Sequence, residues 1–596
     1  MIHQKLKILF EKKQNIKILI LLFAGMLATF FELVSIGSIP AFVMIIVDVN
    51  SFKSILSSYI SLDFLSGINN RSITIVAASI LAFIFLIKNI YFFLIIYFQG
   101  KILKDLRFST SVKLFKYYIN MPYIDHLSVN PAILIRTIES DVGLAFTYIT
   151  HNITLIRESL ILLSLFILLL VADPLISSFA LLFLGIPVFI FYFFYRNKLK
   201  FKGAHLQKLI GKKIKTINHS LGIIKETKLL KRENFFLKSF FEINDKAEKI
   251  NFLSYLMTST PRLFLEVIAL SAVVIVCTLL VFIGRSPESI IPIVSLFAIS
   301  AVRLIPGLNT ITASLATIRL RKPSFDLIVR EAEKLNSSIK IKNFKNINNK
   351  DRVEFNNDIS LKNLSFNYKA ENKIAINNIT MNIKKGTSVG IIGRSGSGKS
   401  TLVDIILGLL EPEKGEIFVD GVNIKNNKHS WQSYIGYIPQ DIYLLDDTIK
   451  NNITFGINNN KINKKLLSES IKIAQLEKFI ESSKNKIDTV VGNRGIRISG
   501  GEKQRIGVAR ALYNNPEILI LDEATSALDI DNENKMLDEI YQGIDNKTLI
   551  VVSHRNNTVK HCDLIYVMEH GKIIDQGPYT KIMERNQYLK ENKSNH

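Results

Sequence analysis

Six long apolar stretches before residue 325 constrain this chain of 596 residues more than any other feature of its sequence. Each is long enough to cross a bilayer as a helix, and a spanning helix satisfies its own backbone hydrogen bonds. Several exceed the roughly 20 residues that the hydrocarbon layer requires, so we expect helices that project beyond the membrane. The stretches cover residues 16–48, 72–99, 140–171, 174–195, 252–284 and 289–320.

Positively charged segments set the predicted orientation of these spans. Segments 101–135, 196–250 and 321–352 carry most of the Lys and Arg of the first half, and such segments stay in the cytoplasm. The breaks at 172–174 and 284–287 allow only tight turns, which we place outside. We therefore predict cytoplasmic termini, with an interfacial helix before the first span and no cleaved signal peptide.

This topology accounts for much of the formal net charge of +24, which comes from 75 Lys and Arg against 51 Asp and Glu. The basic residues bracket membrane spans and no base-stacking module is visible, so we expect no nucleic-acid partner. Cys277 lies in an apolar stretch and Cys562 in the polar half, which indicates neither a disulfide framework nor a cysteine metal site.

The sequence changes character after Lys322, where it turns polar. From Val353 it alternates short β-rich runs with helical stretches, which is typical of a doubly wound α/β domain. We therefore predict an all-α transmembrane domain with six spans, a linker and a cytoplasmic α/β domain. Their boundaries are residues 1–322, 323–352 and 353–585.

A glycine-rich loop follows the short apolar run Val389–Ile392 and precedes a helical stretch. This strand-loop-helix context is the one that a phosphate-binding loop requires. Its glycines let backbone N–H groups close around phosphates, its lysine meets the β and γ phosphates, and the following hydroxyl suits Mg²⁺. The loop consists of Gly393, Arg394, Ser395, Gly396, Ser397, Gly398, Lys399, Ser400 and Thr401.

Two carboxylates follow another apolar run, Ile518–Leu521, at the end of a predicted buried strand. Ligands bind at the carboxyl ends of strands in such sheets. Asp522 therefore suits the surroundings of Mg²⁺, and Glu523 suits a base that orients or deprotonates an attacking water. An exposed acidic strand end is the alternative interpretation.

The run Ile498–Arg505, which reads ISGGEKQR, resembles the signature motif of the ABC ATPases, and other elements of that family occur in its order. Tyr368 in LSFNY is similar to the aromatic residue that stacks on adenine. Gln440 in YIPQD is similar to the Q-loop glutamine, which implies a Mg²⁺ ligand within the catalytic site. Asp529 ends a segment similar to the D-loop, and His554 in VVSHR is similar to the switch histidine.

The resemblance implies ATP and Mg²⁺ as cofactors and a second copy of the chain as partner. In that family the signature of one subunit caps the ATP held by the other, so Ser499, Gly500 and Gly501 imply two composite sites. With Glu523 and His554 present, both sites of a homodimer are expected to hydrolyse ATP. The sequence departs from the usual pattern at Ile498, Glu502 and Asn493.

Six spans before the ATPase domain resemble the exporter type of ABC protein, with fused transmembrane and nucleotide-binding domains. Charged residues within the spans are the candidates for contact with a substrate, because ionisable groups at membrane depth are costly. They are Lys88, Arg262 and Arg303, which suggest a basic cavity for an anionic headgroup. The alternative is that Glu32, Glu158 or Glu266 neutralises them in buried pairs.

The segments FELVSIGSIP, PRLFLE and RLIPGLNTI resemble the lipid-linked-oligosaccharide flippase of bacterial protein N-glycosylation. This implies a multi-pass protein of the cytoplasmic membrane that flips a polyprenyl-diphosphate-linked glycan from the inner to the outer leaflet. Export of lipid A, peptides or hydrophobic drugs is the alternative within the transporters. A channel gated by ATP, or a regulatory ATPase subunit, is the alternative from a different class.

Overall fold

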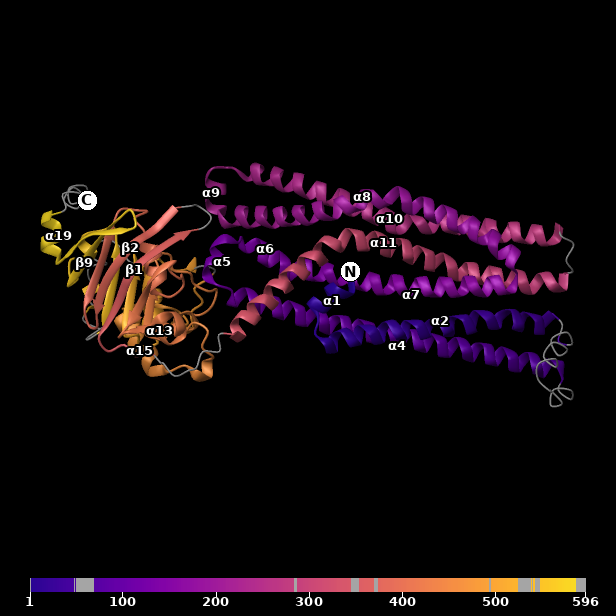
Figure 1. Ribbon diagram of the computed structural model, residues 1–596, viewed down its shortest axis with the longest axis horizontal. Helices are drawn as coiled ribbons and strands as arrows, with labels where there is room; N and C mark the ends of the chain where they lie inside the picture. Colours follow the sequence, from indigo (N-terminus) through magenta and orange to yellow (C-terminus); the bar gives the residue numbers. More distant parts are fainter. Residues whose placement is uncertain are drawn as a thin grey trace. The chain divides into compact units, whose positions relative to one another are not determined.

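A computed structural model describes most of the chain, which divides into two compact units (Figure 1). The first unit consists of Met1–Met121 and Asp125–Phe344, and the second of Pro122–Ile124 and Lys345–His596. Asn493, Asp529 and the predicted turn before Pro287 lie outside the described residues. The described residues are 2–47, 49, 69–282, 287–344, 353–368, 373–492, 495–523, 537–538, 540–541 and 547–585.

Long helices that run alongside one another make up the first unit (Figure 1). Capping side chains fix where some of them begin: Asn69 accepts a hydrogen bond from Arg71 N, and Asn130 caps a short helix with Pro131 at its first position. The elements are α1 (Ile2–Leu9), α2 (Lys12–Val47), α4 (Asn70–Asn120), α5 (Tyr123–Ser128), α6 (Pro131–Arg136), a π-helical turn (Thr137–Asp141), α7 (Val142–Ala172), α8 (Pro174–Gly222), α9 (Ile224–Leu229), α10 (Glu233–Phe282) and α11 (Pro287–Phe344).

Five of the described segments are long and apolar enough to cross a membrane. The predicted fourth span falls in α8, where most side chains between residues 179 and 201 lie outside the described ones. The 51 residues of α4 measure about 75 Å at 1.5 Å per residue, far more than the roughly 30 Å of hydrocarbon. The five segments are Lys12–Val47, Asn70–Asn120, Pro131–Ala172, Glu233–Ile275 and Val294–Ser337.

Helix α11 continues well beyond the residue at which the sequence analysis ended the transmembrane domain. Residues 323–344, assigned above to a linker, belong to this helix. The physical reason is an apolar stripe at helical spacing: Phe325, Ile328 and Val329 are all buried. They pack in one cluster with residues of α4 and α7, and the rings of Phe325 and Tyr148 stack at 4.4 Å.

Two sheets form the frame of the second unit. An antiparallel sheet has the order β2-β1-β4-β5, and a six-stranded sheet has the order β10-β9-β3-β8-β7-β6. In the larger sheet all neighbouring pairs are parallel except β9 with β10. The strands are β1 (Asp358–Tyr368), β2 (Lys373–Lys384), β3 (Ser388–Gly393), β4 (Lys414–Val419), β5 (Val422–Asn423), β6 (Ile435–Ile438), β7 (Ile518–Asp522), β8 (Thr548–Ser553), β9 (Leu564–Glu569) and β10 (Lys572–Gly577).

Helices and apolar side chains cover both faces of the parallel strands. Leu519 and Leu521 of β7 belong to one buried cluster, whereas Ile518 and Ile520 belong to the other. This explains the continuous apolar run, because a parallel strand buried on both faces has no solvent side. The helices are α12 (Lys399–Ile406), α13 (Lys428–Ser433), α14 (Ile449–Ile453), α15 (Lys464–Ile473), α16 (Glu477–Ser482), α17 (Gly500–Leu512) and α19 (Tyr579–Arg585).

Strand β3 lies in the interior of the larger sheet, between β8 and β9, and ligands of open parallel sheets bind at the carboxyl ends of such strands. Strands β6, β7 and β8 lie on one side of β3, and β9 and β10 lie on the other. Helix α12 starts six residues after β3 ends and carries the half-buried Asp404. Burial, assisted by the charge of Asp522, raises the pKa of Asp404 to about 6.

The buried carboxyl of Asp404 predicts a pH-dependent gain in stability for Asp404→Asn. Its raised pKa means that protonation stabilises the fold at low pH, and this contribution is lost as the pH rises through about 6. The neutral amide avoids that loss. We expect the apparent unfolding temperature in detergent to rise by ~2 °C or more at pH 7.5 and the gain to disappear near pH 4. Asp446→Asn, at an exposed position of the same unit, is the control. An equal gain at both pH values would contradict this explanation.

Candidate functional site

The loop after β3 has the backbone conformation of a phosphate cradle. Gly396 and Gly398 have φ values of 80° and 102°, which residues other than glycine rarely adopt. Gly393 approaches a neighbouring strand so closely that a Cβ there would lie 2.2 Å from the Met568 carbonyl oxygen. These glycines leave space and N–H groups at the N-terminus of α12, where an anion is favoured.

Lys399 folds back over this loop. Its Nζ donates hydrogen bonds to the carbonyl oxygens of Gly393 at 2.9 Å and Arg394 at 3.0 Å. Burial lowers the pKa of Lys399, and the carboxylates of Glu523 and Asp522 oppose this shift. Ser397 is buried, and its hydroxyl has no hydrogen-bond partner among the residues that the structure describes. A phosphate bound in the loop would supply an acceptor for both Ser397 and Lys399, so the residues present fit ATP.

Three adjacent parallel strands bring the predicted catalytic residues together. Gln440 follows β6 closely, Glu523 directly follows β7, and His554 directly follows β8. The backbone N–H of Glu523 donates to the Val552 carbonyl oxygen of β8 at 2.9 Å, which fixes its position. Residues distant in the sequence thus meet because the carboxyl ends of neighbouring parallel strands share one edge of the sheet.

The Glu523 carboxylate lies between the other two side chains. Gln440 Nε2 donates to Glu523 Oε2 at 2.7 Å, and His554 Nδ1 lies 3.1 Å from Glu523 Oε1. Glu523 has a φ of 48°, an unfavourable conformation for a residue with a side chain, and such strain clusters at functional sites. The arrangement orients one carboxylate, as a general base or water-positioning group requires.

Asp522 ends β7 and is buried. The Tyr437 hydroxyl donates to Asp522 Oδ2 at 3.3 Å. Burial raises the pKa of Asp522; the Tyr437 hydrogen bond opposes this rise, and the charge of Glu523 adds to it. The sequence analysis did not select Tyr437, although it lies in the YIPQD segment that supplied Gln440.

The residues predicted to surround Mg²⁺ have the oxygen chemistry that this ion prefers. Ser400 is exposed at the second position of α12, and Gln440 keeps its amide oxygen after its nitrogen bonds Glu523. With Asp522 at the end of β7, Ser400 and Gln440 would hold the ion. The ion would neutralise phosphate charge during hydrolysis.

Tyr368 ends β1 beside the N-terminal turn of α12. Its hydroxyl lies 3.2 Å from the Thr401 hydroxyl, and its ring packs edge-on against Phe366 at 5.0 Å. These contacts connect the predicted adenine-stacking residue with the last residue of the phosphate loop. Stacking on adenine stays a prediction.

The signature segment begins α17. Glu502, at which the sequence departs from the usual motif, forms a capping box with Ser499. Ser499 Oγ accepts a hydrogen bond from Glu502 N at 3.3 Å, and Glu502 Oε2 accepts one from Ser499 N at 2.7 Å. Glutamate at this position therefore preserves local order at the start of the helix. The Ser499 hydroxyl still has its proton to donate to a ligand, with Gly500 and Gly501 following in the first turn.

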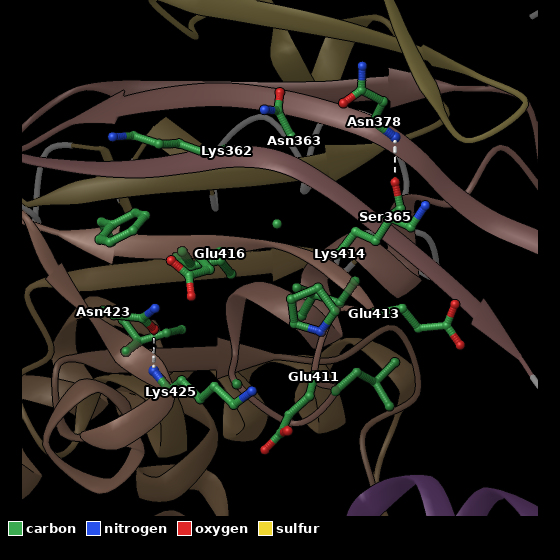
Figure 2. Close-up of a pocket in the computed structure, with 18 of the residues that line it drawn as sticks. Lys362, Asn363, Ser365, Asn378, Glu411, Glu413, Lys414, Glu416, Asn423 and Lys425 are labelled. Carbon is green, nitrogen blue, oxygen red and sulfur yellow. Dashed lines mark hydrogen bonds between the residues drawn. The ribbon is translucent and has the colours of Figure 1, made fainter.

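A separate cavity of about 980 Å³ in the second unit contains none of these residues (Figure 2). Its lining carries charges of both signs, from Lys362, Lys414, Lys425, Lys428, Glu411, Glu413 and Glu416. Such a mixture of charges favours no ligand of one sign. The phosphate loop, with its orphaned Ser397 hydroxyl, is the better candidate for the nucleotide site.

Two of the three predicted intramembrane cations meet at buried carboxylates. Arg303 on α11 bonds Glu32 on α2 through Nε, and its Nη2 lies 3.3 Å from Glu158 Oε2 on α7. Lys88 on α4 lies 3.5 Å from Glu32. Arg157, which the sequence analysis did not select, lies 3.3 Å from Glu158. These five residues, here called the ion cluster, have the paired arrangement that was the alternative to a free basic cavity.

Arg262 does not join the ion cluster through any described contact. Its Nε lies 2.7 Å from Glu266 Oε1, one helical turn along α10, and both side chains are exposed. This ion pair therefore lies within a single helix. The three cations that the sequence analysis grouped therefore occupy two different environments.

Comparison with known proteins supports the assignment of the second unit. Residues 376–526 match the family model described as ABC transporter. A curated relative, the alpha-hemolysin translocation ATP-binding protein HlyB of Proteus vulgaris, is 41% identical over 231 residues, which are 39% of this chain and 32% of the relative. The leukotoxin export ATP-binding protein LtxB of Aggregatibacter actinomycetemcomitans is 39% identical over 232 residues, also 39% of this chain and 32% of that protein. The chain thus spans about a third of the length of these relatives.

A solved structure resembles the chain over almost its whole length. It is described as a bacterial Atm1-family ABC exporter with ATP bound, and its TM-score is 0.74 with 20% identity. The likeness covers 98% of this chain and 99% of that chain, so it confirms the predicted fold class. Residues 376–526 thus match the ABC transporter family model, whose ATPase domain uses ATP with Mg²⁺, and the chain as a whole has the fold of the structure described as an ABC exporter.

Proposed function

We propose that this protein is a half-size ABC exporter that uses ATP to move an amphiphilic substrate outward across the cytoplasmic membrane. The observation that carries the proposal is the Glu523 carboxylate, held between Gln440 and His554 at the sheet edge. The same chain also contains five described segments of membrane-spanning length and composition. A regulatory subunit or channel would not require so complete a set of hydrolytic residues.

A second copy of the chain is the proposed partner. The described hydrogen bonds of Ser499 go to Glu502 on its own helix, and Ser499 is exposed. Its hydroxyl proton is thus available to the nucleotide of another copy. Two composite sites would form in the homodimer, each with its own Glu523 and His554.

Within one site, the residues divide the work of hydrolysis. The phosphate loop and Lys399 hold the phosphates, and Mg²⁺ neutralises their charge when bound. Glu523 orients the attacking water and accepts its proton, while Gln440 and His554 fix the carboxylate in place. Because each of these contacts joins adjacent strands, small movements of the sheet edge would alter hydrolysis.

The ion cluster supports an anionic headgroup as the recognised part of the substrate. Lys88, Arg157 and Arg303 face the carboxylates of Glu32 and Glu158, so the described cluster has one positive charge in excess. An unmatched charge at membrane depth costs several kcal/mol. A diphosphate would offset that cost, which favours the polyprenyl-diphosphate-linked oligosaccharide with its lipid tail left in the bilayer.

Peptide or protein export is the second candidate, and the toxin translocation proteins among the relatives favour it. The aligned 231 residues are about as many as the ATP-binding domain contains. Likeness in a region of that size bears on ATP hydrolysis more than on cargo, because cargo is recognised by the spans. Transport assays therefore have to include both substrate classes.

Replacing the base should separate ATP binding from hydrolysis. In Glu523→Gln, the amide keeps the shape of the side chain but cannot accept the proton from water. We expect the ATPase rate in nanodiscs to fall by ~100-fold or more while a fluorescent ATP analogue still binds. The control is Glu517→Gln, which changes the residue directly before β7. If Glu523→Gln retained ATP hydrolysis, another residue would have to act as the base.

Removing the excess charge should identify the headgroup. In Arg157→Gln, Lys88 and Arg303 still match Glu32 and Glu158, so the cluster becomes neutral. We expect about tenfold slower ATP-driven flipping of a fluorescent polyprenyl-diphosphate oligosaccharide in proteoliposomes, with basal ATPase activity retained.

Arg262→Gln is the matched control, because it removes an exposed cation that lies outside the ion cluster. A fluorescent peptide is assayed in parallel. Peptide transport without lipid transport would establish the second candidate. If Arg157→Gln and Arg262→Gln slow flipping equally, the ion cluster has no specific role in substrate recognition.

A further inference from the structure

One short segment, formed by β6 and the residues just after it, holds both carboxylates at the end of β7. The Tyr437 hydroxyl donates to Asp522 Oδ2 at 3.3 Å, and three residues later Gln440 Nε2 donates to Glu523 Oε2 at 2.7 Å. Each of two successive carboxylates thus has its own donor from the neighbouring strand. The bond from Gln440 holds the candidate base, whereas the bond from Tyr437 holds a residue on the metal side of the site.

The register of the sheet explains why tyrosine reaches Asp522. In the parallel pairing of β6 with β7, Tyr437 lies opposite Ile520, so Asp522 lies two residues further along β7. Residues two apart in a strand point to the same face and are roughly 7 Å apart. A side chain that covers this distance must be long and must end in a donor, as tyrosine does. Its ring also packs against the buried cluster that contains Ile520.

The Tyr437 hydroxyl holds one oxygen of the Asp522 carboxylate. Oδ2 accepts its hydrogen bond, whereas Oδ1 accepts none from any residue that the structure describes. The χ2 rotation of an aspartate is soft, so a bond to one oxygen is needed to fix the orientation of the other. Oδ1 therefore keeps one orientation and remains available to a magnesium ion or to one of its waters.

A second carboxyl lies close to the same hydroxyl. Burial, followed by the charges of Asp522 and Asp404, raises the pKa of Tyr437. Asp404 is half-buried on α12, and its side chain accepts no hydrogen bond from the described part of the chain. Because Tyr437 bonds Asp522 and not Asp404, the carboxylate that is held in place is the one beside Glu523.

We propose that Tyr437 is a positioning residue for the magnesium site, which acts by fixing the carboxylate of Asp522. Hydrogen bonds to the residues around a metal ion typically change its affinity by 10–100-fold, although the donor does not touch the ion. Tyr437 therefore affects binding of nucleotide together with metal and leaves binding of nucleotide alone unchanged. This inference rests on the proposed function, because it takes the loop 393–401 as the nucleotide site.

The test measures Mn²⁺ binding by electron paramagnetic resonance on the full chain in nanodiscs, with a non-hydrolysable ATP analogue present. Mn²⁺ prefers the same oxygen ligands as Mg²⁺. We expect Tyr437→Phe, which keeps the ring, to weaken Mn²⁺ binding about tenfold. Tyr434→Phe is the matched control and should bind Mn²⁺ as the parent does. Its hydroxyl donates to the Val353 carbonyl oxygen at 3.1 Å, and its ring packs against the same cluster.

Two further measurements separate positioning of the carboxylate from a general loss of structure. A fluorescent ATP analogue in EDTA should bind the parent and Tyr437→Phe equally, because the phosphate loop is unchanged. In an Asp522→Asn background, Tyr437→Phe should have no further effect on Mn²⁺ binding, because the two residues act as one unit. A tenfold loss that persists in that background, or an equal loss of nucleotide binding in EDTA, would overturn the positioning role.

The parent protein distinguishes failure of this inference from failure of the proposed function. If the parent binds Mn²⁺ with nucleotide and Tyr437→Phe binds it equally well, the role of Tyr437 is overturned and the proposed function is not. A parent that binds no nucleotide would overturn both. Tyr437→Leu, which also lacks a donor, repeats the test if Tyr437→Phe cannot be purified.

Discussion

The bonds from Arg303 to Glu32 and Glu158 are the contacts on which the membrane unit most depends. One guanidinium on α11 binds carboxylates of α2 and α7, although its partners lie 271 and 145 residues away. In an apolar environment these groups cost several kcal/mol unless they are paired. The need for pairing therefore determines which helices pack together. Contacts between apolar helix surfaces specify the neighbours of a helix less well. An anion that entered this cluster would have to compete with carboxylates that already hold the cations.

The second unit follows a different rule, in which the parallel sheet is buried on both faces and only its edge is open to chemistry. Apolar side chains of β7 alternate between two cores, so polar residues are confined to the ends of the strands. Gln440, Glu523 and His554 are neighbours for this reason. Their positions depend on strand order more than on loop conformation, which gives the site a rigid base.

Local patterns in the sequence indicate which residues follow the strands of the candidate ATP site, whereas they do not indicate pairings between distant residues. The loop 393–401 and Glu523 follow recognisable strands, so their neighbours could be inferred. The spacing of four residues indicates the pair of Arg262 and Glu266. Nothing local says that Glu32 and Glu158 pair with Arg303. Likewise, Tyr437 does not by itself indicate a bond to Asp522, because aromatic residues are common in strands. The polar composition of residues 323–344 predicts a linker, whereas the spacing of Phe325, Ile328 and Val329 indicates the helix that the structure shows.

The charges of the two candidate sites do not balance. The carboxyl edge of the sheet has more carboxylates than cations, and the ion cluster has more cations than carboxylates. At the sheet edge, Asp522 and Glu523 oppose Lys399, and burial keeps the pKa of Asp522 raised. Mg²⁺, when bound, would supply positive charge beside these two carboxylates. In the ion cluster the described cations outnumber the carboxylates, and an anion would supply negative charge there. Because a desolvated charge is costly until its partner arrives, each site stores part of the free energy that its ligand releases on binding.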